Sequence, residues 1–397
     1  MMKPRRIEQT LLGYRLTSPV IVSSGFLTRN VELLQKAENH GAGGASIKSV
    51  SFSIATEVPR NFRPDVTVLP GGKSIVCPGD RRPTGPEIAG VIQEIKRQGT
   101  GMMIIGSAAG GGRDNQKWIE TATKLEAAGA DAIEFNASHP FVDVPPEVFM
   151  APFPDRMAPA IRAVKEAINV PLIVKLTAVT ADLGLLAQAC EEAGADAITI
   201  MNALPAAPPI DIRNGVRPVS QTLENLTWTC LTGQAIFPVA CYAVAHVSRK
   251  VSIPVIGCGG ISSWMDVVKM IMWGASAVQI CTAIHLQGFR TIDKINKGLE
   301  RFMEEEGYSS IEDFRGLALK QILPQHEVKL KEDYWLTVRE DRCNLCKRCL
   351  HIGQCLAISL HNDTIFIDNE KCLPCGTCIQ VCPKEAIEVR PRASVRN

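Results

Sequence analysis

Residues 18–300 alternate short, continuously apolar runs with longer stretches in which apolar residues recur at helical spacing. Runs that are apolar at consecutive positions are typical of parallel strands covered by helices. Helices are expected between most of them, for example over 115–128, 155–168, 181–193 and 263–273. The eight predicted strands are 19–24, 43–49, 102–108, 131–137, 171–177, 196–202, 254–260 and 275–283.

An internal repeat indicates how these elements are arranged. EAAGADAIE at 126–134 returns as EEAGADAIT at 191–199, with a weaker copy, WGASAVQI, at 273–280. Each copy is a helix that ends at a glycine, where a left-handed backbone costs little, followed at once by a buried strand. Eight such strands favour a (β/α)8 or TIM barrel. The alternative is an open doubly wound sheet, but no G-x-G-x-x-G follows the first strand and no nicotinamide fingerprint occurs.

The segment 50–85, after the second strand, is long and rich in proline, glycine and arginine. In barrels such loops form lids or oligomer contacts, and a solvated excursion is an equal alternative.

Eight of the fourteen cysteines lie in the last 55 residues, in two runs. One has the spacing C-x2-C-x2-C-x5-C, and the other has C-x2-C-x2-C-x3-C-P, the bacterial ferredoxin pattern. In such runs three thiolates hold one [4Fe–4S] cluster and the fourth cysteine ligates the other cluster. Zinc ligands come instead as separated pairs, and disulfides are rare in a reducing compartment. The expected ligands are Cys343, Cys346, Cys349 and Cys382 for one cluster, and Cys372, Cys375, Cys378 and Cys355 for the second.

Composition excludes some classes of function. A formal charge of +2 without a long basic run argues against nucleic acid as the main partner. The start MMKPRRIEQT has no apolar region behind its charges, and no run approaches the ~18–20 apolar residues of a membrane span. We therefore expect a cytoplasmic protein with no membrane partner, in a compartment that keeps thiolates available for iron.

The carboxyl ends of the predicted strands hold the candidate chemistry, because barrel enzymes place their reactive groups there. Lys48 and Lys175 follow apolar stretches, where an unpaired charge is costly to bury. Together with two strand-end asparagines, they favour a bound anionic group over side chains that reach solvent. Gly259 and Gly260 end the seventh strand and offer backbone N–H groups to a phosphate. Phosphate on one side and lysines on the other describe FMN, which also links hydride chemistry to the single electrons of clusters.

The chain resembles the dihydroorotate dehydrogenase superfamily, and its cluster tail resembles that of the bacterial NAD-dependent dihydropyrimidine dehydrogenase catalytic subunits. The matching pieces are SPVIVSSG, GASIKS, GADAIEFNASHP, PLIVKLT, ITIMN, LTGQAIFP, GCGGI and VQICTA, within roughly residues 10–300 and 335–390. The resemblance implies that Lys175 lies against the flavin and that Asn136 and Asn202 bind the substrate ring. The residues it implies for FMN binding are Ser23, Ser24, Lys48, Ser49, Gly233, Gly259, Gly260, Cys281 and Thr282.

One departure from the family pattern affects the chemistry. The resemblance implies a cysteine or serine after the fourth strand, which supplies the proton that complements hydride transfer. That position is Met150 here, and no cysteine occurs between residues 78 and 189. Since a thioether cannot donate a proton, either another group does or the substrate differs. The first candidate is His139, followed by Asp143, Glu147 and Asp155, and each has the alternative of packing or of facing solvent.

The sequence thus predicts an FMN-binding barrel over 1–310, a linker over 311–334 and a two-cluster ferredoxin-like domain over 335–397. The expected function is an oxidoreductase that passes electrons between clusters and FMN, and a hydride between FMN and an organic substrate. The family resemblance implies that this substrate is a pyrimidine or dihydropyrimidine. Alternatives are another unsaturated or cyclic substrate, an electron-transfer subunit without catalysis, and a Schiff-base barrel using Lys175. The expected partner is a separate NAD(P)H-oxidising flavoprotein subunit or a ferredoxin, in a homo- or hetero-oligomer.

Overall fold

The eight predicted strands close into a parallel barrel in the structure, a computed structural model that describes residues 6–52, 66–77, 83–110, 112–137, 150, 153–219, 223–328 and 334–391. Neighbours pair in chain order, and the last strand pairs with the first. The predicted TIM barrel is confirmed, and every strand lies within its expected range. The strands are β3 (Val20–Val22), β4 (Gly44–Ser46), β7 (Met103–Ala108), β8 (Ala132–Phe135), β9 (Leu172–Leu176), β10 (Ala197–Ile200), β15 (Val255–Cys258) and β16 (Ala277–Ile280).

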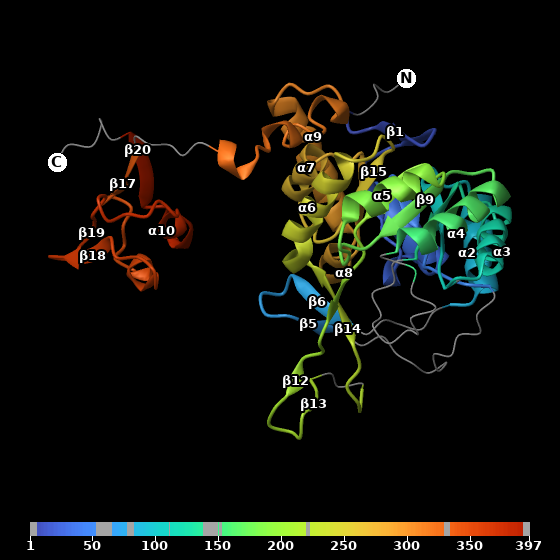
Figure 1. Ribbon diagram of the computed structural model, residues 1–397, viewed down its shortest axis with the longest axis horizontal. Helices are drawn as coiled ribbons and strands as arrows, with labels where there is room; N and C mark the ends of the chain where they lie inside the picture. The colour runs from blue at the N-terminus through green and yellow to red at the C-terminus, as the bar shows by residue number, and fades with distance from the viewer. Residues whose placement is uncertain are drawn as a thin grey trace. The chain divides into compact units, whose positions relative to one another are not determined.

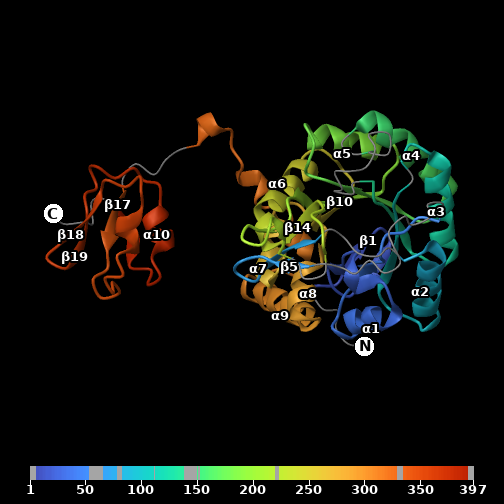
Figure 2. The same ribbon diagram turned by 90° about the horizontal axis from the view of Figure 1, so that it is seen from below.

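Helices surround the barrel (Figures 1 and 2). The helix–glycine–strand repeat appears as predicted, because Gly129, Gly194 and Gly274 have φ of 101°, 102° and 108°. A side chain there would be strained, and glycine lets each helix turn directly into the next strand. The helices are α1 (Val31–Asn39), α2 (Gly85–Arg97), α3 (Asn115–Ala127), α4 (Pro154–Ala167), α5 (Leu183–Glu192), α6 (Phe237–Ser248), α7 (Trp264–Met272), α8 (Thr282–Gln287) and α9 (Arg290–Glu305).

The barrel interior changes character along its axis. Near one end, apolar side chains such as Ile21, Ile105, Ile173 and Ile256 form a buried cluster with the hairpin β1 (Gln9–Leu11) and β2 (Tyr14–Leu16). Toward the carboxyl ends of the strands the buried side chains are polar, for example Glu134. The apolar end stabilises the fold, and the polar end is the place to look for chemistry.

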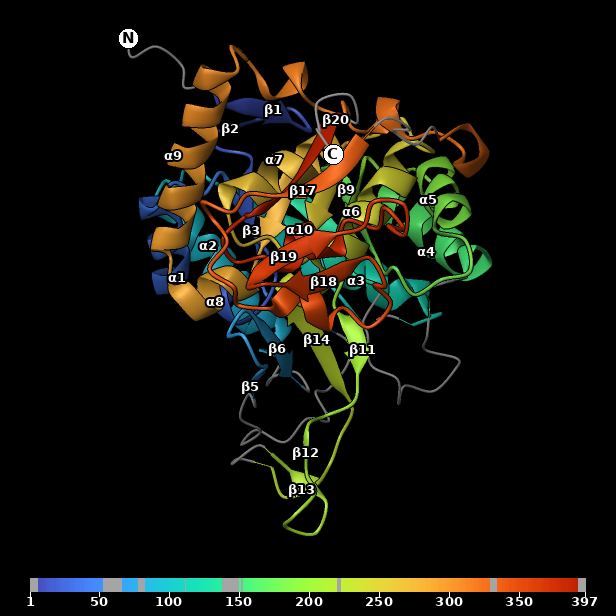
Figure 3. The same cartoon turned by 90° about the vertical axis from the view of Figure 1, so that its left-hand side faces the viewer.

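A small antiparallel sheet lies outside the barrel and was not predicted. It has the order β11 (Leu204–Ala206), β14 (Thr229–Gly233), β6 (Ser74–Cys77) and β5 (Thr67–Val68), and Figure 3 shows it below the barrel. The hairpin of β12 (Ile210–Asp211) and β13 (Arg217–Pro218) extends beyond it. Part of segment 50–85, which we expected as a loop, is therefore strand. Its central pairing joins segments about 150 residues apart, so no local pattern reveals it.

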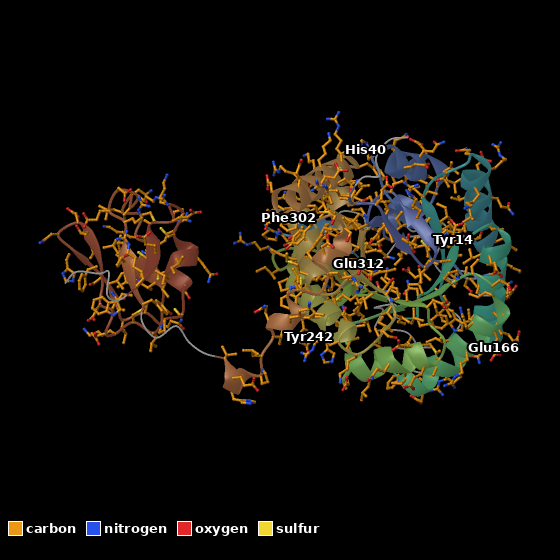
Figure 4. The ribbon with its side chains drawn as sticks, turned by 90° about the horizontal axis from the view of Figure 1, so that it is seen from above. Tyr14, His40, Glu166, Tyr242, Phe302 and Glu312 are labelled. Carbon is orange, nitrogen blue, oxygen red and sulfur yellow. The ribbon has the colours of Figure 1, made fainter. Side chains whose placement is uncertain are left out.

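The chain divides into two compact units, Met1–Ile322 and Leu323–Asn397. Phe302 of α9, labelled in Figure 4, packs against Tyr308 and Phe314 with ring centroids 5.8 and 5.7 Å away. Ile311 and Phe314, within the range predicted as linker, are 1% and 0% exposed. This segment is thus part of the core of the first unit.

The second unit is small and built around two antiparallel pairs. Strand β17 (Tyr334–Val338) pairs with β20 (Ile387–Pro391), and β18 (Ile358–His361) pairs with β19 (Thr364–Ile367). Its apolar core includes Leu336, Ile367 and Ile387, and one short helix, α10 (Thr377–Val381), packs beside it. Across the described parts of both units, every helix is too short or too polar to cross a membrane.

Candidate active site

A cavity of about 1160 Å³, including its open mouth, lies at the carboxyl ends of the barrel strands. The small antiparallel sheet forms part of its lining through Ile75, Cys77, Cys230 and Thr232. Most residues that the sequence singled out for cofactor and substrate line this one cavity. They are Ser23, Ser24, Lys48, Lys175, Asn202, Gly233, Gly259, Gly260, Cys281 and Thr282.

Lys175 is a buried cation at the base of this cavity. Its side chain points inward from β9 and is 3% exposed as a residue. The Nζ atom donates to Gln279 Oε1 at 3.0 Å and to Ser23 Oγ at 3.3 Å, and lies 3.7 Å from Glu134 Oε1. Burial is the largest single influence and lowers the pKa of this ammonium. Glu134, together with Cys258 and Cys281, more than offsets burial, so the pKa lies above its usual value. The cavity therefore has a charged lysine in its lining.

Glu134 lies behind the cavity on β8 and is fully buried. Its carboxylate accepts hydrogen bonds from Gln279 Nε2 at 2.7 Å, Ser46 Oγ at 3.0 Å, and Ser107 Oγ and Thr199 Oγ1 at 3.3 Å each. These donors come from four other strands of the barrel. The sequence analysis missed Glu134 and Gln279, although both are polar residues within otherwise apolar strands, which was an available signal.

A chain of hydroxyl and amide groups leads to the two predicted substrate asparagines. Ser24 Oγ and Ser49 Oγ are 3.0 Å apart, and Asn136 Nδ2 donates to Ser49 Oγ at 3.1 Å. Asn202 Nδ2 donates in turn to Asn136 Oδ1 at 3.1 Å. Asn136 and Ser49 are 7% and 8% exposed. The fold thus brings these four side chains together from the ends of β3, β4, β8 and β10, which are far apart in the sequence.

The three glycines predicted for FMN, of which Gly259 and Gly260 were predicted for its phosphate, have left-handed conformations that other residues rarely adopt. Gly233, Gly259 and Gly260 have φ of 88°, 120° and 76°. A Cβ on Gly260 would lie 2.6 Å from the backbone nitrogen of Phe237, and one on Gly233 would lie 2.5 Å from the Lys73 carbonyl oxygen. Because these residues have no side chains, their backbone groups are exposed at the margin of the cavity. Backbone N–H groups in such positions can bind an anion.

Several thiols line the cavity that the sequence analysis did not foresee there. Cys77 and Cys230 face each other across β6 and β14, and Cys258 lies 3.8 Å from Ser23 Oγ. Burial raises the pKa of Cys230 to about 12 and that of Cys281 to about 11. The pKa of Cys258 is also raised by burial, so Cys230, Cys258 and Cys281 are protonated at neutral pH, which suits packing rather than nucleophilic roles.

The residues considered as replacements for the family's acid lie in different places relative to the cavity. His139, Asp143 and Glu147 lie outside the described residues. Asp155 is exposed in the first turn of α4, away from the cavity lining, and Met150 is buried in the core. His285 of α8, which the sequence analysis did not consider, does line the cavity.

In the second unit the eight cysteines form the two groups of four that the spacing predicts. The first four line a hollow with apolar residues such as Val338 and Ile387, and the other four line a second hollow with Leu336 and Ile358. No three His, Cys, Asp or Glu side chains in the described ranges are close enough to hold a single metal ion. Four thiols around a hollow have the composition of an iron–sulfur ligand set. The groups are Cys343, Cys346, Cys349 and Cys382, and Cys355, Cys372, Cys375 and Cys378.

The fold and site define a class: a TIM barrel with a charged, polar cavity at its carboxyl face, joined to a cysteine-rich unit. Comparison with known proteins agrees. The profile of the Dihydroorotate dehydrogenase family matches residues 6–303, and that of the 4Fe-4S binding domain matches residues 365–388.

Two kinds of relative illustrate the match. The dihydroorotate dehydrogenase B (NAD(+)) catalytic subunit of Pyrococcus furiosus is 34% identical over 79% of this chain and 99% of its own length. The NAD-dependent dihydropyrimidine dehydrogenase subunit PreA of Escherichia coli is 27% identical over 88% of this chain and 85% of its own length. The chain belongs to the dihydroorotate dehydrogenase family, a flavoprotein family of oxidoreductases, and carries a 4Fe–4S binding segment.

Proposed function

We propose that the protein is an FMN- and iron–sulfur-dependent oxidoreductase that transfers a hydride between FMN and the CH–CH bond of a pyrimidine-type ring. The observation that carries the proposal is the convergence of a buried ammonium, the Asn202 amide, which is bonded to Asn136, and three left-handed glycines on one cavity. The names of the relatives describe dehydrogenases of dihydroorotate and dihydropyrimidines, which are CH–CH oxidoreductases.

The residues present fit FMN. When bound, FMN would supply the hydride chemistry and the conversion between two-electron and one-electron transfer. Gly233, Gly259 and Gly260 would hold the phosphate end through backbone groups. Lys175 would place its positive charge against the ring system, where negative charge develops on reduction. Ser23, which contacts both Lys175 and Gln279, would orient that ammonium.

Asn136 and Asn202 are the groups we propose for the substrate. A carboxamide both donates and accepts hydrogen bonds, as the alternating N–H and C=O groups of a pyrimidine edge do. Because the two amides are bonded to each other and to Ser49, their orientations are held before substrate binds. Such preorganisation favours a planar ring presented at a defined angle.

The proton that accompanies hydride transfer needs a donor other than Met150. His139 is our first candidate from the sequence, and His285, which lines the cavity, is the second. An imidazole titrates near neutral pH and can serve as general acid or base.

We further propose that the two cysteine groups hold two [4Fe–4S] clusters. The family match covers residues 365–388, which include Cys372, Cys375, Cys378 and Cys382. The first three line one hollow and Cys382 lines the other, as the exchange of the fourth ligand between clusters requires. The relatives are named as subunits, so the proposed electron partner is a separate NAD(P)H-oxidising flavoprotein subunit or a ferredoxin.

The test is anaerobic reoxidation of the photoreduced protein. Excess uracil or, separately, orotate should restore the oxidised flavin and cluster absorbance. Asn202→Ala should keep the flavin absorbance but lose most of the reoxidation rate, because Asn202 lines the cavity and, among the described residues, its side chain donates to Asn136 and to no residue expected to bind FMN. A protein that binds flavin and bleaches normally yet is reoxidised by neither compound would contradict the pyrimidine assignment. That result would favour the alternative, an electron-carrying subunit.

A further inference from the structure

The charge of Lys175 depends on a carboxylate that does not itself reach the cavity. Lys175 lines the cavity, whereas Glu134 is fully buried behind it, with 3.7 Å between Nζ and Oε1. A lysine buried without an anion gives up its proton, because desolvation disfavours the charged form. The protonation of Lys175 in the cavity therefore depends on its pairing with Glu134.

The position of the carboxylate is determined by the barrel. Ser46, Ser107, Thr199 and Gln279 donate to it from β4, β7, β10 and β16 at 2.7–3.3 Å. A carboxyl group that accepts this many hydrogen bonds is held in one orientation and cannot turn away from its partner. Gln279 contacts both charges, because its Nε2 donates to Glu134 and its Oε1 accepts from Lys175.

Among the described titratable groups around the Lys175 ammonium, Glu134 is the one that supplies negative charge to it. Cys258 of β15 and Cys281, which follows β16, also face it, but burial raises the pKa of both thiols, so they are neutral at physiological pH. Lys48 lines the same cavity, but a second lysine cannot supply the negative charge that a buried ammonium needs.

We propose that Glu134 is a positioning residue that keeps Lys175 protonated and aimed into the cavity, so that the flavin site has a built-in positive charge. The inference rests on the proposed binding of FMN. The flavin's electron affinity is then set by a carboxylate that touches neither cofactor nor substrate. Glu134→Gln removes the anion with little change of shape, so the ammonium loses its proton and the positive charge of Lys175 disappears from the cavity.

Sulfite binding to the oxidised holoprotein measures this charge without any turnover. Sulfite adds to flavin more tightly when a positive charge lies beside the ring, and the loss of flavin absorbance reports the fraction bound. In the wild-type protein the sulfite affinity should not show a titration of Lys175 between about pH 6 and 9. In Glu134→Gln the affinity at pH 8 should fall about tenfold or more and recover as the pH is lowered, because the lysine is protonated again.

Thr199→Val is the matched control. It removes one neutral hydrogen bond to the same carboxylate, at 3.3 Å, and leaves both charges in place. Its pH profile should follow that of the wild type. An affinity in Glu134→Gln that equals or exceeds the wild-type value at every pH would overturn the proposal, because Lys175 would then hold its proton without Glu134.

A double-mutant cycle tests the ion pair independently of the flavin. Lys175→Met leaves the buried carboxylate without its cation, and Glu134→Gln forces the buried lysine to give up its proton, whereas the double variant avoids both costs. In urea unfolding, the double variant should therefore lose less free energy of unfolding than the two single variants lose together. It is expected to fold even where a single variant does not. Additive effects would refute the coupling. A purified protein without a flavin band would contradict the proposed function, while the cycle would still decide whether Glu134 holds the lysine charge.

Discussion

The backbone of Gly260 cannot accommodate a side chain, and the consequence can be calculated from the structure. In Gly260→Ala the new Cβ would lie 2.6 Å from both the nitrogen and the Cβ of Phe237 and 2.7 Å from its Cα. The residue also has φ of 76°, a left-handed conformation. That conformation costs an alanine about 1–2 kcal/mol, and forced overlap in a packed region adds about 1–3 kcal/mol. We expect a total loss of about 2–5 kcal/mol in the free energy of unfolding.

Gly307→Ala separates the two contributions. Gly307 has φ of 75°, nearly the same as Gly260, but a Cβ there would meet nothing within 4 Å. Gly307→Ala should lose only the part of the free energy of unfolding that comes from the left-handed backbone, about 1–2 kcal/mol. Urea unfolding followed by tryptophan fluorescence suits the comparison, because Trp118, Trp228, Trp264 and Trp273 lie in the barrel unit.

The packing around Gly260 also bears on cofactor binding. Because Gly260 lines the cavity, Gly260→Ala should lower the FMN content of the purified protein, and Gly307→Ala should not. Equal destabilisation of the two variants, with equal flavin content, would refute the reasoning that Phe237 leaves no room at this position.

Three further predictions follow from other parts of the molecule. Cys190 is fully buried in α5, and burial raises its pKa from 9.0 to about 12. The unfolded chain therefore loses the thiol proton at a lower pH than the folded protein does. The contribution of this thiol to the free energy of unfolding is complete below about pH 9 and is lost as the pH rises toward 12. The loss amounts to ~4 kcal/mol over that range, and urea unfolding at several pH values should show it in the wild type and not in Cys190→Ala. Trp118→Ala should lower the free energy of unfolding by about 3–5 kcal/mol, because the buried indole packs against Phe135 with ring centroids 4.0 Å apart. Trp118→Phe keeps an aromatic ring and should lose less stability. Equal losses in the two variants would contradict the packing argument. Cys375→Ala should roughly halve the iron bound per chain, measured by metal analysis, whereas unchanged iron would exclude Cys375 as a ligand.

Local sequence carried much of the information about this fold. Each barrel strand is a run of apolar residues, and a glycine such as Gly129 or Gly194 marks where a helix turns into the next strand. These signals lie within a few residues of one another, so they can be recognised without knowing the fold. The spacing of the cysteines is similarly local and predicts the grouping found around the two hollows. Membership of the dihydroorotate dehydrogenase family, expected from short motifs, is confirmed by the profile match over residues 6–303.

Other features depend on contacts between distant residues. Strand β6 pairs with β14 although about 150 residues separate them, and neither has an apolar run long enough to predict a strand. The strand-end asparagines Asn136 and Asn202 were identifiable as candidates, but only barrel closure brings their amides within 3.1 Å. Likewise, Glu134 stands out in the sequence only as a polar residue in an apolar strand, and nothing nearby in the sequence identifies its partner. Its pairing with Lys175 arises because parallel strands in register direct both side chains into one interior, where a charge without a partner would be too costly to keep.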